Sequence, residues 1–497
     1  HYLTTARAIG NPKLQEQCEA VLDALPKLLE EYHAKPDAEG AMKIGDVVLW
    51  LEQAGQAADL IRSIREYFSQ PNLFVEVSAD FIDAGIGGPV DETGPVKDVI
   101  LGARISGTEH TTGQLCVELL PNDKYAEITT VFQGRAESQT VGSKGPARVS
   151  SGGVTRVASR KTLRINAERI WTLPAQSRAI TNTDIRSVRT VRGGPIIGQA
   201  AQRQVSSQKG QAERIAAQHA EQRSARRIDE QADPQIAELA ESYQKNFRQP
   251  LLDRKLFPQM LRFRTTEKAM HATALHGGLP GLGALGPPPA LESDRDLAVR
   301  VHESLVNNFM AQALGGAIVE EEVVRARLTE MLGSTPTWLE PDEETEPWTI
   351  TFARNQPVTV SFADGGFTVT LRGRQYYRGE SGYPGMNVTA AYKIEKSDNG
   401  FKAVRQGDLE IFPPGFVPGQ GRQLSTRQQV LRSLLEKTFG NVFQEEIVPE
   451  PLVLSGEWEK AGELVPVTWE ASGGWLVLAW DQVAKADDAA PTAEAAE

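Results

Sequence analysis

The chain has little cysteine, little histidine and no long apolar stretch. Its two cysteines, Cys18 and Cys116, stand far apart in 497 residues, which excludes a CxxC redox motif and a zinc site built from cysteines. They can pair with each other, but the leucines and valines spaced around Cys18 favour two separate, buried and unpaired thiols. The seven histidines form no cluster along the sequence. Because no window approaches the ~18 to 20 consecutive apolar residues of a membrane helix, we expect no membrane span in this sequence.

Recognisable catalytic motifs are also lacking, and the near matches stand in the wrong physical context. Residues 281–286 read GxGxxG, but a dinucleotide loop needs a helix after it, and here three prolines follow. His302 and Glu303 lack the second histidine of an HExxH zinc motif. The spacing of His302 to Leu305 and Phe309 predicts a packed or helix-capping histidine instead. The sequence therefore names no catalytic, cofactor-binding or metal-binding residue.

Positive charge, in contrast, is concentrated in one segment. Residues 135–192 contain twelve Lys or Arg and three acidic residues, within a chain whose formal net charge is -12. Such polarisation indicates a cationic surface, either for an anionic partner or for the acidic remainder of the chain. Basic and apolar residues alternate along the predicted strands, so one face of this sheet should be cationic and solvated. The candidate anion-binding face consists of Arg148, Arg156, Arg160, Arg164 and Arg169.

Anionic lipid or a polyanion is the partner class that such a face would fit. Nucleic acid is a poor match, because the basic segment contains Trp171 as its single aromatic residue and the sequence pI is about 5.3. A protein partner could use the helix predicted at 196–231. Its thin apolar stripe is typical of a helix that lies across another element or stays solvated.

Hydrophobic periodicity predicts an α+β protein with two antiparallel-sheet units, each preceded by helices, and a long polar helix between them. Helical spacing fills the first 70 residues, and period-two alternation begins near Leu73 and resumes near Trp348. The long helix follows Pro195, and Asp233-Pro234 should interrupt it. The expected segments are a helical hairpin (1–70), a basic antiparallel sheet (71–192), a long helical segment (193–273), a Gly/Pro linker (274–291), a helical block with an acidic connector (292–347), a second sheet with a C-terminal helix (348–480) and a disordered acidic tail (481–497).

Several strings resemble an uncharacterised family of exported proteins from planctomycete bacteria. They are PVKDVILGARISGT (95–108), LLPND (119–123), GSKGPARVSSGGVT (142–155) and DLAVRVHESLVNN (296–308). This resemblance implies an extracytoplasmic location, in the periplasm or cell envelope, and brings no activity, cofactor or catalytic residue. The chain begins at His1, so we expect its true start to have been removed or to lie outside this sequence. A signal peptide or membrane anchor before His1 is left open.

The order of a long antiparallel sheet and a long helix is similar to that of tubular lipid-binding modules, in which a curved sheet wraps a helix around an apolar groove. Three functions follow from these patterns. The first is a non-enzymatic cell-envelope binding or structural protein with a cationic sheet face for an anionic partner. The alternative, which the second resemblance implies, is a lipid or amphiphile carrier whose basic face meets anionic head groups. The third is a hydrolase with no recognisable motif.

Overall fold

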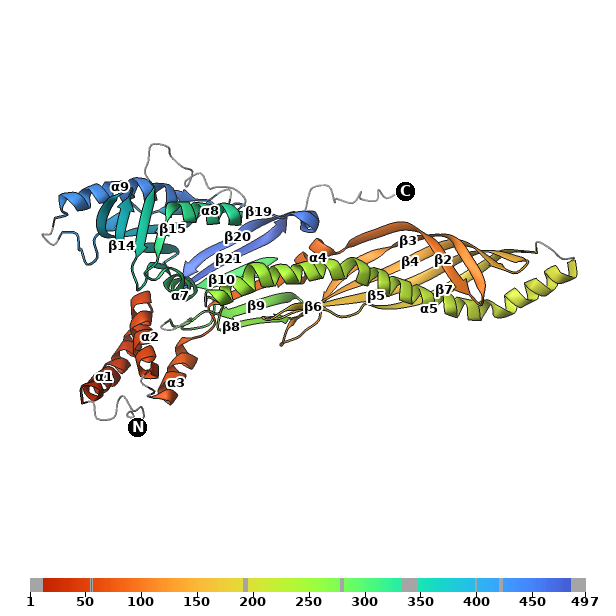
Figure 1. Ribbon diagram of the computed structural model, residues 1–497, viewed down its shortest axis with the longest axis horizontal. Helices are drawn as coiled ribbons and strands as arrows, with labels where there is room; N and C mark the ends of the chain where they lie inside the picture. The colour runs from red at the N-terminus through yellow and green to blue at the C-terminus, as the bar shows by residue number, and fades with distance from the viewer. Residues whose placement is uncertain are drawn as a thin grey trace, which may run out of the picture.

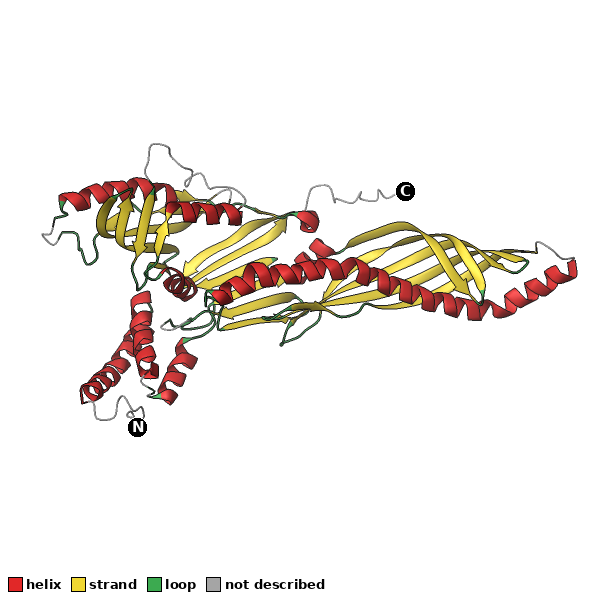
Figure 2. Ribbon diagram, viewed as in Figure 1, coloured by secondary structure: helices red, strands yellow, loops and turns green. Residues whose placement is uncertain are grey.

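The computed structural model of the protein describes residues 12–53, 55, 57–190, 195–277, 281–332, 347–397, 400–419 and 423–483. It is an elongated molecule with three antiparallel sheets, and one long helix lies along the most extended of them (Figure 1, Figure 2). The α+β class with a long helix between sheet units is therefore confirmed. Residues 481–483, which were expected in a disordered tail, end a strand, and the remainder of that tail lies outside the described residues.

The N-terminal unit contains three helices: α1 (Pro12–Ala34), α2 (Ala38–Gln53) and α3 (Ala58–Phe68). The expected hairpin had only two. Its second helix is divided because Ala57 has a φ of 52°, a left-handed conformation that cannot continue a right-handed helix. The three helices share a core that includes Leu25, Ile44 and Leu51.

The central sheet was not anticipated, because its strands come from four separate parts of the chain. Its order is β19-β20-β21-β10-β1-β9-β8. Strands β8 and β9 replace the end of the expected helical segment, and β10 replaces the start of the expected helical block. The leucine and valines of β10 fit both periods, and its pairing with β1 and β21 makes it a strand. The strands are β1 (Leu73–Ser78), β8 (Met260–Thr265), β9 (Ala269–Leu275), β10 (Leu297–His302), β19 (Leu452–Val453), β20 (Glu463–Ser472) and β21 (Trp475–Val483).

Residues 88–190, which include most of the basic segment, form a long curved sheet, here called the tubular sheet. Strands β2 to β5 are consecutive neighbours, and β6 and β7 both pair with β5, so β2 and β7 are its two lateral edges. The 19-residue strands β4 and β5 span about 63 Å. The end of the tubular sheet that lies farthest from the central sheet is here called the distal tip. Gly102 (φ 75°) and Gly145 (φ 56°) are in the turns of the two hairpins that end there. The strands are β2 (Gly88–Ile100), β3 (Ala103–Leu119), β4 (Ala126–Lys144), β5 (Ala147–Ile165), β6 (Ile170–Thr172) and β7 (Gln176–Thr190).

Helix α5 (Pro195–Ser242) begins beyond the distal tip and runs back along the tubular sheet (Figure 1). Its 48 residues correspond to about 72 Å. Pro234 does not interrupt it, contrary to the sequence prediction. The preceding Asp233 is fixed on the sheet by Lys161 (2.5 Å) and Thr172 (3.1 Å), which holds the backbone helical through the proline. A π-helical turn, η1 (Tyr243–Arg248), and α6 (Gln249–Asp253) lead from α5 into β8.

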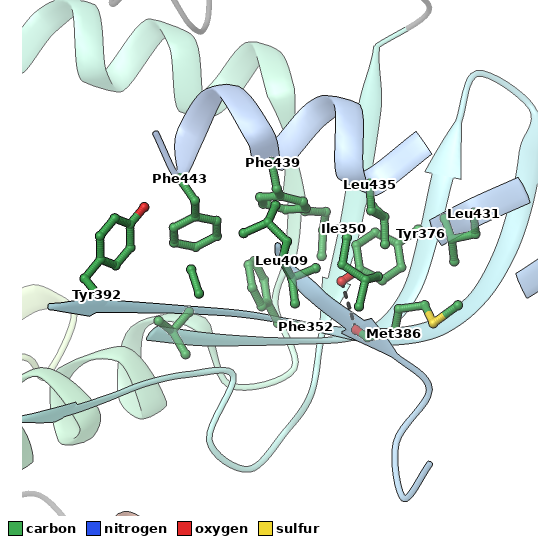
Figure 3. Packing of buried hydrophobic residues seen from close by; sticks show 14 of the residues in the cluster. Ile350, Phe352, Tyr376, Met386, Tyr392, Leu409, Leu431, Leu435, Phe439 and Phe443 are labelled. Carbon is green, nitrogen blue, oxygen red and sulfur yellow. Dashed lines mark hydrogen bonds between the residues drawn. The ribbon is translucent and has the colours of Figure 1, made fainter. Parts of the chain in front are cut away.

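The third sheet carries the largest apolar core of the described residues. Helix α9 (Thr426–Val442) lies on it and buries Leu431, Leu435 and Phe439 against residues such as Met386 (Figure 3). A capping box formed by Ser425 and Gln428 starts α9. The other elements of this unit are α7 (Glu303–Leu314), β11 (Ile318–Glu320), α8 (Glu321–Leu332), β12 (Trp348–Phe352), β13 (Val358–Ala363), β14 (Gly366–Arg378), β15 (Ser381–Ser397), β16 (Gly400–Arg405), β17 (Glu410–Phe412) and β18 (Glu446–Ile447).

In the Gly/Pro segment 274–291, several of the described residues are packed, although an open linker was expected. Leu282 and Ala284 are almost fully buried, and the backbone of Ala284 pairs with that of Gln70 at the end of the helical unit. Glycine and proline prevent a helix here, but they do not prevent packing. The segment therefore joins the units instead of separating them.

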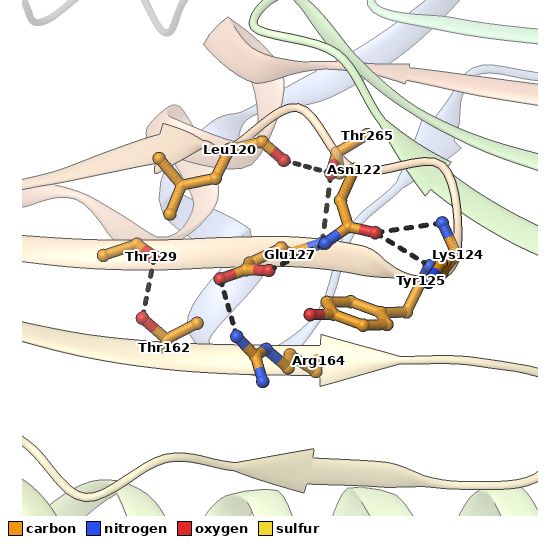
Figure 4. Close-up of polar contacts among 9 residues, drawn as sticks. All are labelled: Leu120, Asn122, Lys124, Tyr125, Glu127, Thr129, Thr162, Arg164 and Thr265. Carbon is orange, nitrogen blue, oxygen red and sulfur yellow. Dashed lines mark hydrogen bonds and ion pairs between the residues drawn. The ribbon is translucent and has the colours of Figure 1, made fainter.

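Thr265 on β8 attaches the tubular sheet to the central sheet (Figure 4). Its backbone exchanges two hydrogen bonds with Asn122, in the loop between β3 and β4. Its hydroxyl donates to the carbonyl of Leu120 (2.5 Å) and accepts from the amide of Glu127 (3.1 Å). Helix α4 (Ala79–Ile86) adds apolar contact at this end of the tubular sheet.

Candidate ligand groove

A groove lies between α5 and the concave face of the tubular sheet. Successive residues of a strand point to opposite faces, and one face of each strand lines a cavity of about 510 Å³ under the helix. Its apolar wall lies near the distal tip and includes Ile100, Ala103, Ile105, Val149 and Ile185. Farther from the tip the wall carries hydroxyl groups, which pair across strands as Thr140 with Ser151 (3.1 Å) and Thr155 with Thr181 (2.9 Å).

Half of the side chains that the helix contributes to the groove are alanine or valine, and the other half are long and polar or charged. Ala200, Val205, Ala212 and Ala216 line the cavity, together with glutamines. The lining extends to Arg223, about 35 Å along the helix axis from Ala200. The alanines of the helix and the Ala, Ser, Thr and Gly residues of the sheet leave space between the two walls.

Around the groove, the described residues of the tubular sheet form no apolar core of their own. Along β3, inward residues are only half-buried and outward residues are exposed until Leu119 near the central sheet. The apolar clusters of the described residues lie in the other units, and the one that includes Leu119 sits at the attached end. The concave face is thus covered by α5 without being packed against it.

Acidic residues of α5 hold the helix on one edge of the sheet. Glu213 and Glu221 accept the backbone N–H groups of Thr183 (2.7 Å) and Ala179 (2.9 Å) on β7, and Asp229 accepts that of Ala175 (2.9 Å), just before this strand. Eight residues of helix rise about 12 Å and four residues of strand about 13 Å, so the two spacings match. These bonds also cover N–H groups of an edge strand that has no further strand partner.

Basic residues of α5 reach the opposite edge. Asp98 on β2 contacts His219 (2.7 Å) and Arg223 (2.9 Å), and Glu92 pairs with Arg227. Acids face β7 and bases face β2, so the polar helix closes the curved sheet from edge to edge. Among the described residues from Gln199 to Ala212, no side chain makes a hydrogen bond or ion pair to the sheet, and the distal part of the helix lies over the groove without such anchors.

Lys161 anchors the inner end of the groove. Its side chain is 3% exposed and contacts Asp229 (2.6 Å) and Asp233 (2.5 Å). Burial lowers the pKa of Lys161, but its hydrogen bonds to both aspartates outweigh this effect and raise the pKa overall. Nearby, Ser159 and Ser224 touch at 2.9 Å, which brings helix and sheet together and ends the cavity.

The structure distributes the predicted arginine face unevenly. Arg148, Arg156 and Arg160 are exposed on the convex face of β5, although Arg160 pairs with Glu118 (3.1 Å). Arg164 is half-buried at the junction with the central sheet, where it bonds Glu127 and lies over the ring of Tyr125 (Figure 4). Arg169 lies beyond the end of β5 and stacks over Trp171. A shallow hollow of about 550 Å³ on the convex face is bordered by Arg135, Arg156 and Arg178.

The groove residues themselves were not predicted. Threonines, serines and alanines at alternating positions are weak signals, because they suit both a solvated face and a ligand-facing one. The eight-residue repeat of acids on α5 was visible in the sequence, but its meaning depends on the edge of β7.

His302 and the polar pocket near it have a structural explanation. His302 caps α7, because its Nδ1 accepts the amide of Ser304 (3.2 Å). Burial lowers the pKa of His302 to about 4, so the ring is neutral. The capping prediction is confirmed.

A neighbouring cavity of about 240 Å³ contains the buried Glu303, which accepts the amide of Phe362 (2.9 Å). In the part of the chain that the structure describes, no group of three or more His, Cys, Asp or Glu side chains is arranged for a metal ion.

None of the helices within the described ranges combines the length and apolar character that a membrane crossing requires. No protein-family model and no curated protein matches the chain. Among solved structures, lipopolysaccharide binding protein is similar over 84% of this chain and 99% of its own, with 9% identity and a TM-score of 0.26. P47 from Clostridium botulinum A2 is similar over 84% of this chain and 100% of its own, with 8% identity and a TM-score of 0.23. At these scores the likeness carries no functional argument, and the geometry of the groove must carry it.

Proposed function

We propose that this chain is a non-enzymatic binding or carrier protein of the cell envelope, which holds a lipid or other amphiphile between α5 and the concave face of the tubular sheet. In this account, a part of the cationic convex face meets an anionic partner. This proposal combines the first two functions of the sequence analysis, the envelope binding protein with a cationic face and the carrier of a lipid or amphiphile.

The unfilled groove is the observation that carries this proposal. Protein interiors are normally packed as densely as organic crystals, and an empty cavity of this size forgoes the dispersion contacts that a core provides. Binding pockets for small molecules have volumes of about 300 to 1,000 Å³, and this cavity falls in that range. A ligand would supply the missing core.

The lining indicates an amphiphile. An apolar tail fits the wall near Ile105 and Val149, while hydroxyls such as Thr155 can exchange hydrogen bonds with a polar group. The groove is about 35 Å long. A bilayer core of about 30 Å holds two leaflets, so one acyl chain needs roughly half that length and fits within the groove.

Filling the groove with a large side chain tests the proposal. Ala216→Trp places an indole in the cavity, and Gln218→Trp places the same group on the exposed side of α5. We expect a fluorescent fatty acid to bind the unmodified chain and the Gln218→Trp variant saturably. Each buried methylene contributes about 0.8 kcal/mol, so excluding a few of them should weaken binding to the Ala216→Trp variant roughly a hundredfold. Equal binding by all three proteins would reject the groove as the site.

A further inference from the structure

One cross-strand row of residues at the distal tip carries unpaired positive charge. The backbone register places Val99 opposite Arg104, Arg104 opposite Ser143, Ser143 opposite Arg148, and Arg148 opposite Arg189. All five side chains are exposed on the convex face. Residues directly opposite each other in antiparallel strands have Cβ atoms about 5 Å apart, so the row is a compact band across β2, β3, β4, β5 and β7.

The band has no acidic counterpart within the described chain. None of its three arginines forms an ion pair with a described carboxylate, and Arg148 and Arg189 face each other directly, which is unfavourable. A second arginine pair on this face, Arg135 opposite Arg156, is different because Glu137 bonds Arg135 at 2.7 Å. The nearest acid on this face, Asp184, lies opposite Gly152, about 13 Å along the strand from Arg148. The tip therefore keeps a like-charge cluster that an external anion would stabilise.

Apolar groups and the end of the groove meet this band. The side chains of Val99 and Val141 are exposed, at 57% and 42%. The hairpin residues Leu101, Lys144 and Pro146 line the distal end of the groove. Cationic, exposed apolar and groove-lining residues thus occupy the same end of the molecule.

We propose that the distal tip docks on an anionic lipid bilayer and presents the end of the groove to it. Arg104, Arg148 and Arg189 contact the head groups, Val99 and Val141 enter the interface, and an amphiphile passes between the bilayer and the groove. The docking stands on charge complementarity and exposed apolar area, and the passage of a ligand rests on the proposed function above. A bilayer fits better than a soluble polyanion because it offers both anionic head groups and an apolar layer.

The test uses the full chain and vesicles of phosphatidylcholine, with or without an equal amount of phosphatidylglycerol. The tip variant is Arg104→Gln/Arg148→Gln/Arg189→Gln. The matched control is Arg135→Gln/Arg156→Gln/Arg178→Gln, which removes the same charge from the same face nearer the central sheet. Each cation near an anionic surface contributes about a factor of five, so vesicle flotation should show roughly a hundredfold weaker binding for the tip variant and little change for the control. Binding should also decrease as salt shortens the Debye length from about 10 Å at 0.1 M to about 3 Å at 1 M.

Three results would overturn the docking proposal: equal loss in both triple variants, loss only in the control, or binding to soluble polyphosphate without binding to vesicles. Fatty-acid binding in the absence of vesicles separates the two proposals. If the tip variant binds fatty acid normally but no longer binds vesicles, both stand. If no protein binds fatty acid while the tip still determines vesicle binding, the groove proposal fails and docking stands. Thermal unfolding of each variant checks that exposed substitutions leave the fold intact.

Discussion

Single residues in this protein are exposed or buried according to the strand face they occupy. Cys116 shows this most simply. It was expected to be buried, but it is an exposed, unpaired residue on the convex face of β3. Its neighbours Leu115 and Val117 point inward, and period-two alternation directs the cysteine outward. The expectation that Cys116 is buried was wrong, and the side chain of Cys18 lies outside the described residues.

Cys116 should react with a thiol reagent in the native protein. Peptide mapping by mass spectrometry should find the label on Cys116 before any denaturant is added, because the thiol is accessible. The Cys116→Ser variant serves as the control for the labelled peptide. Labelling that requires denaturation would show that this face of β3 is covered.

Glu303 gives a pH dependence whose sign follows from its burial. Burial raises the pKa of Glu303, and the hydrogen bond from the Phe362 amide only partly opposes this. The folded state therefore binds this proton more tightly than the unfolded state, so its contribution to the free energy of unfolding is largest at low pH. That contribution decreases as pH rises through the unfolded value of about 4.5 and then the raised folded value.

Glu303→Gln keeps an acceptor for the Phe362 amide and removes the titration. Denaturant unfolding should find the variant more stable than the unmodified chain at pH 7, and the difference should shrink as the pH approaches 4. Glu320→Gln, an exposed position, should show no such trend. A difference that grows toward low pH would contradict the proposed cause.

At the scale of elements, α5 closes the tubular sheet through its edges and not through an apolar face. Its acids contact β7 and its bases contact β2, which explains why so polar a helix is held on the sheet from Glu213 to Asp233. A long polar helix between sheet units was predicted, and it is confirmed. The surface expected to bind another protein is instead occupied in part by the chain's own sheet.

The three carboxylates of α5 that accept N–H groups at the β7 edge should act together as a clamp. In Glu213→Ala/Glu221→Ala/Asp229→Ala, the amides of Ala175, Ala179 and Thr183 lose their acceptors. Each bond to a charged, partly exposed acceptor contributes about 1 kcal/mol, so hydrogen exchange in β7 should accelerate by one to two orders of magnitude, as estimated from these energies. Glu230→Ala, an exposed acid on the same helix, is the control. Unchanged exchange in β7 would show that the clamp contributes nothing to closure.

For the whole molecule, periodicity in the sequence predicts those helices and strands that depend mainly on residues close together in the chain. Strong alternation in β3, β4 and β5 and helical spacing in α5 and α9 were enough to predict the class and the long helix. The central sheet could not be predicted, because β1 pairs with β9 and β10, which are about 200 residues away. The groove could not be predicted either, because the Ser, Thr, Ala, Val and Ile residues of its walls form a site only when the sheet curves around α5.

The distribution of charged residues is also a property of the whole molecule. The basic segment belongs to a sheet whose two edge strands, β2 and β7, are bonded to α5, while its convex face has exposed arginines near the distal tip. The sequence analysis left two roles open for the arginines of this segment: they could bind an external anion, or they could form ion pairs within the chain. Arg160 and Arg164 have internal partners, whereas Arg148 and Arg189, together with Arg104 from outside the basic segment, remain for an external one.

The central claim is that the groove holds an amphiphile, and native mass spectrometry of the full chain purified from its own host tests it most directly. The account predicts a mass increment that corresponds to a lipid and disappears on denaturation. The increment should persist in Gln218→Trp and be absent in Ala216→Trp, because only the second substitution fills the groove. A chain that carries no ligand in any of the three proteins, or the same increment in all three, would contradict the account.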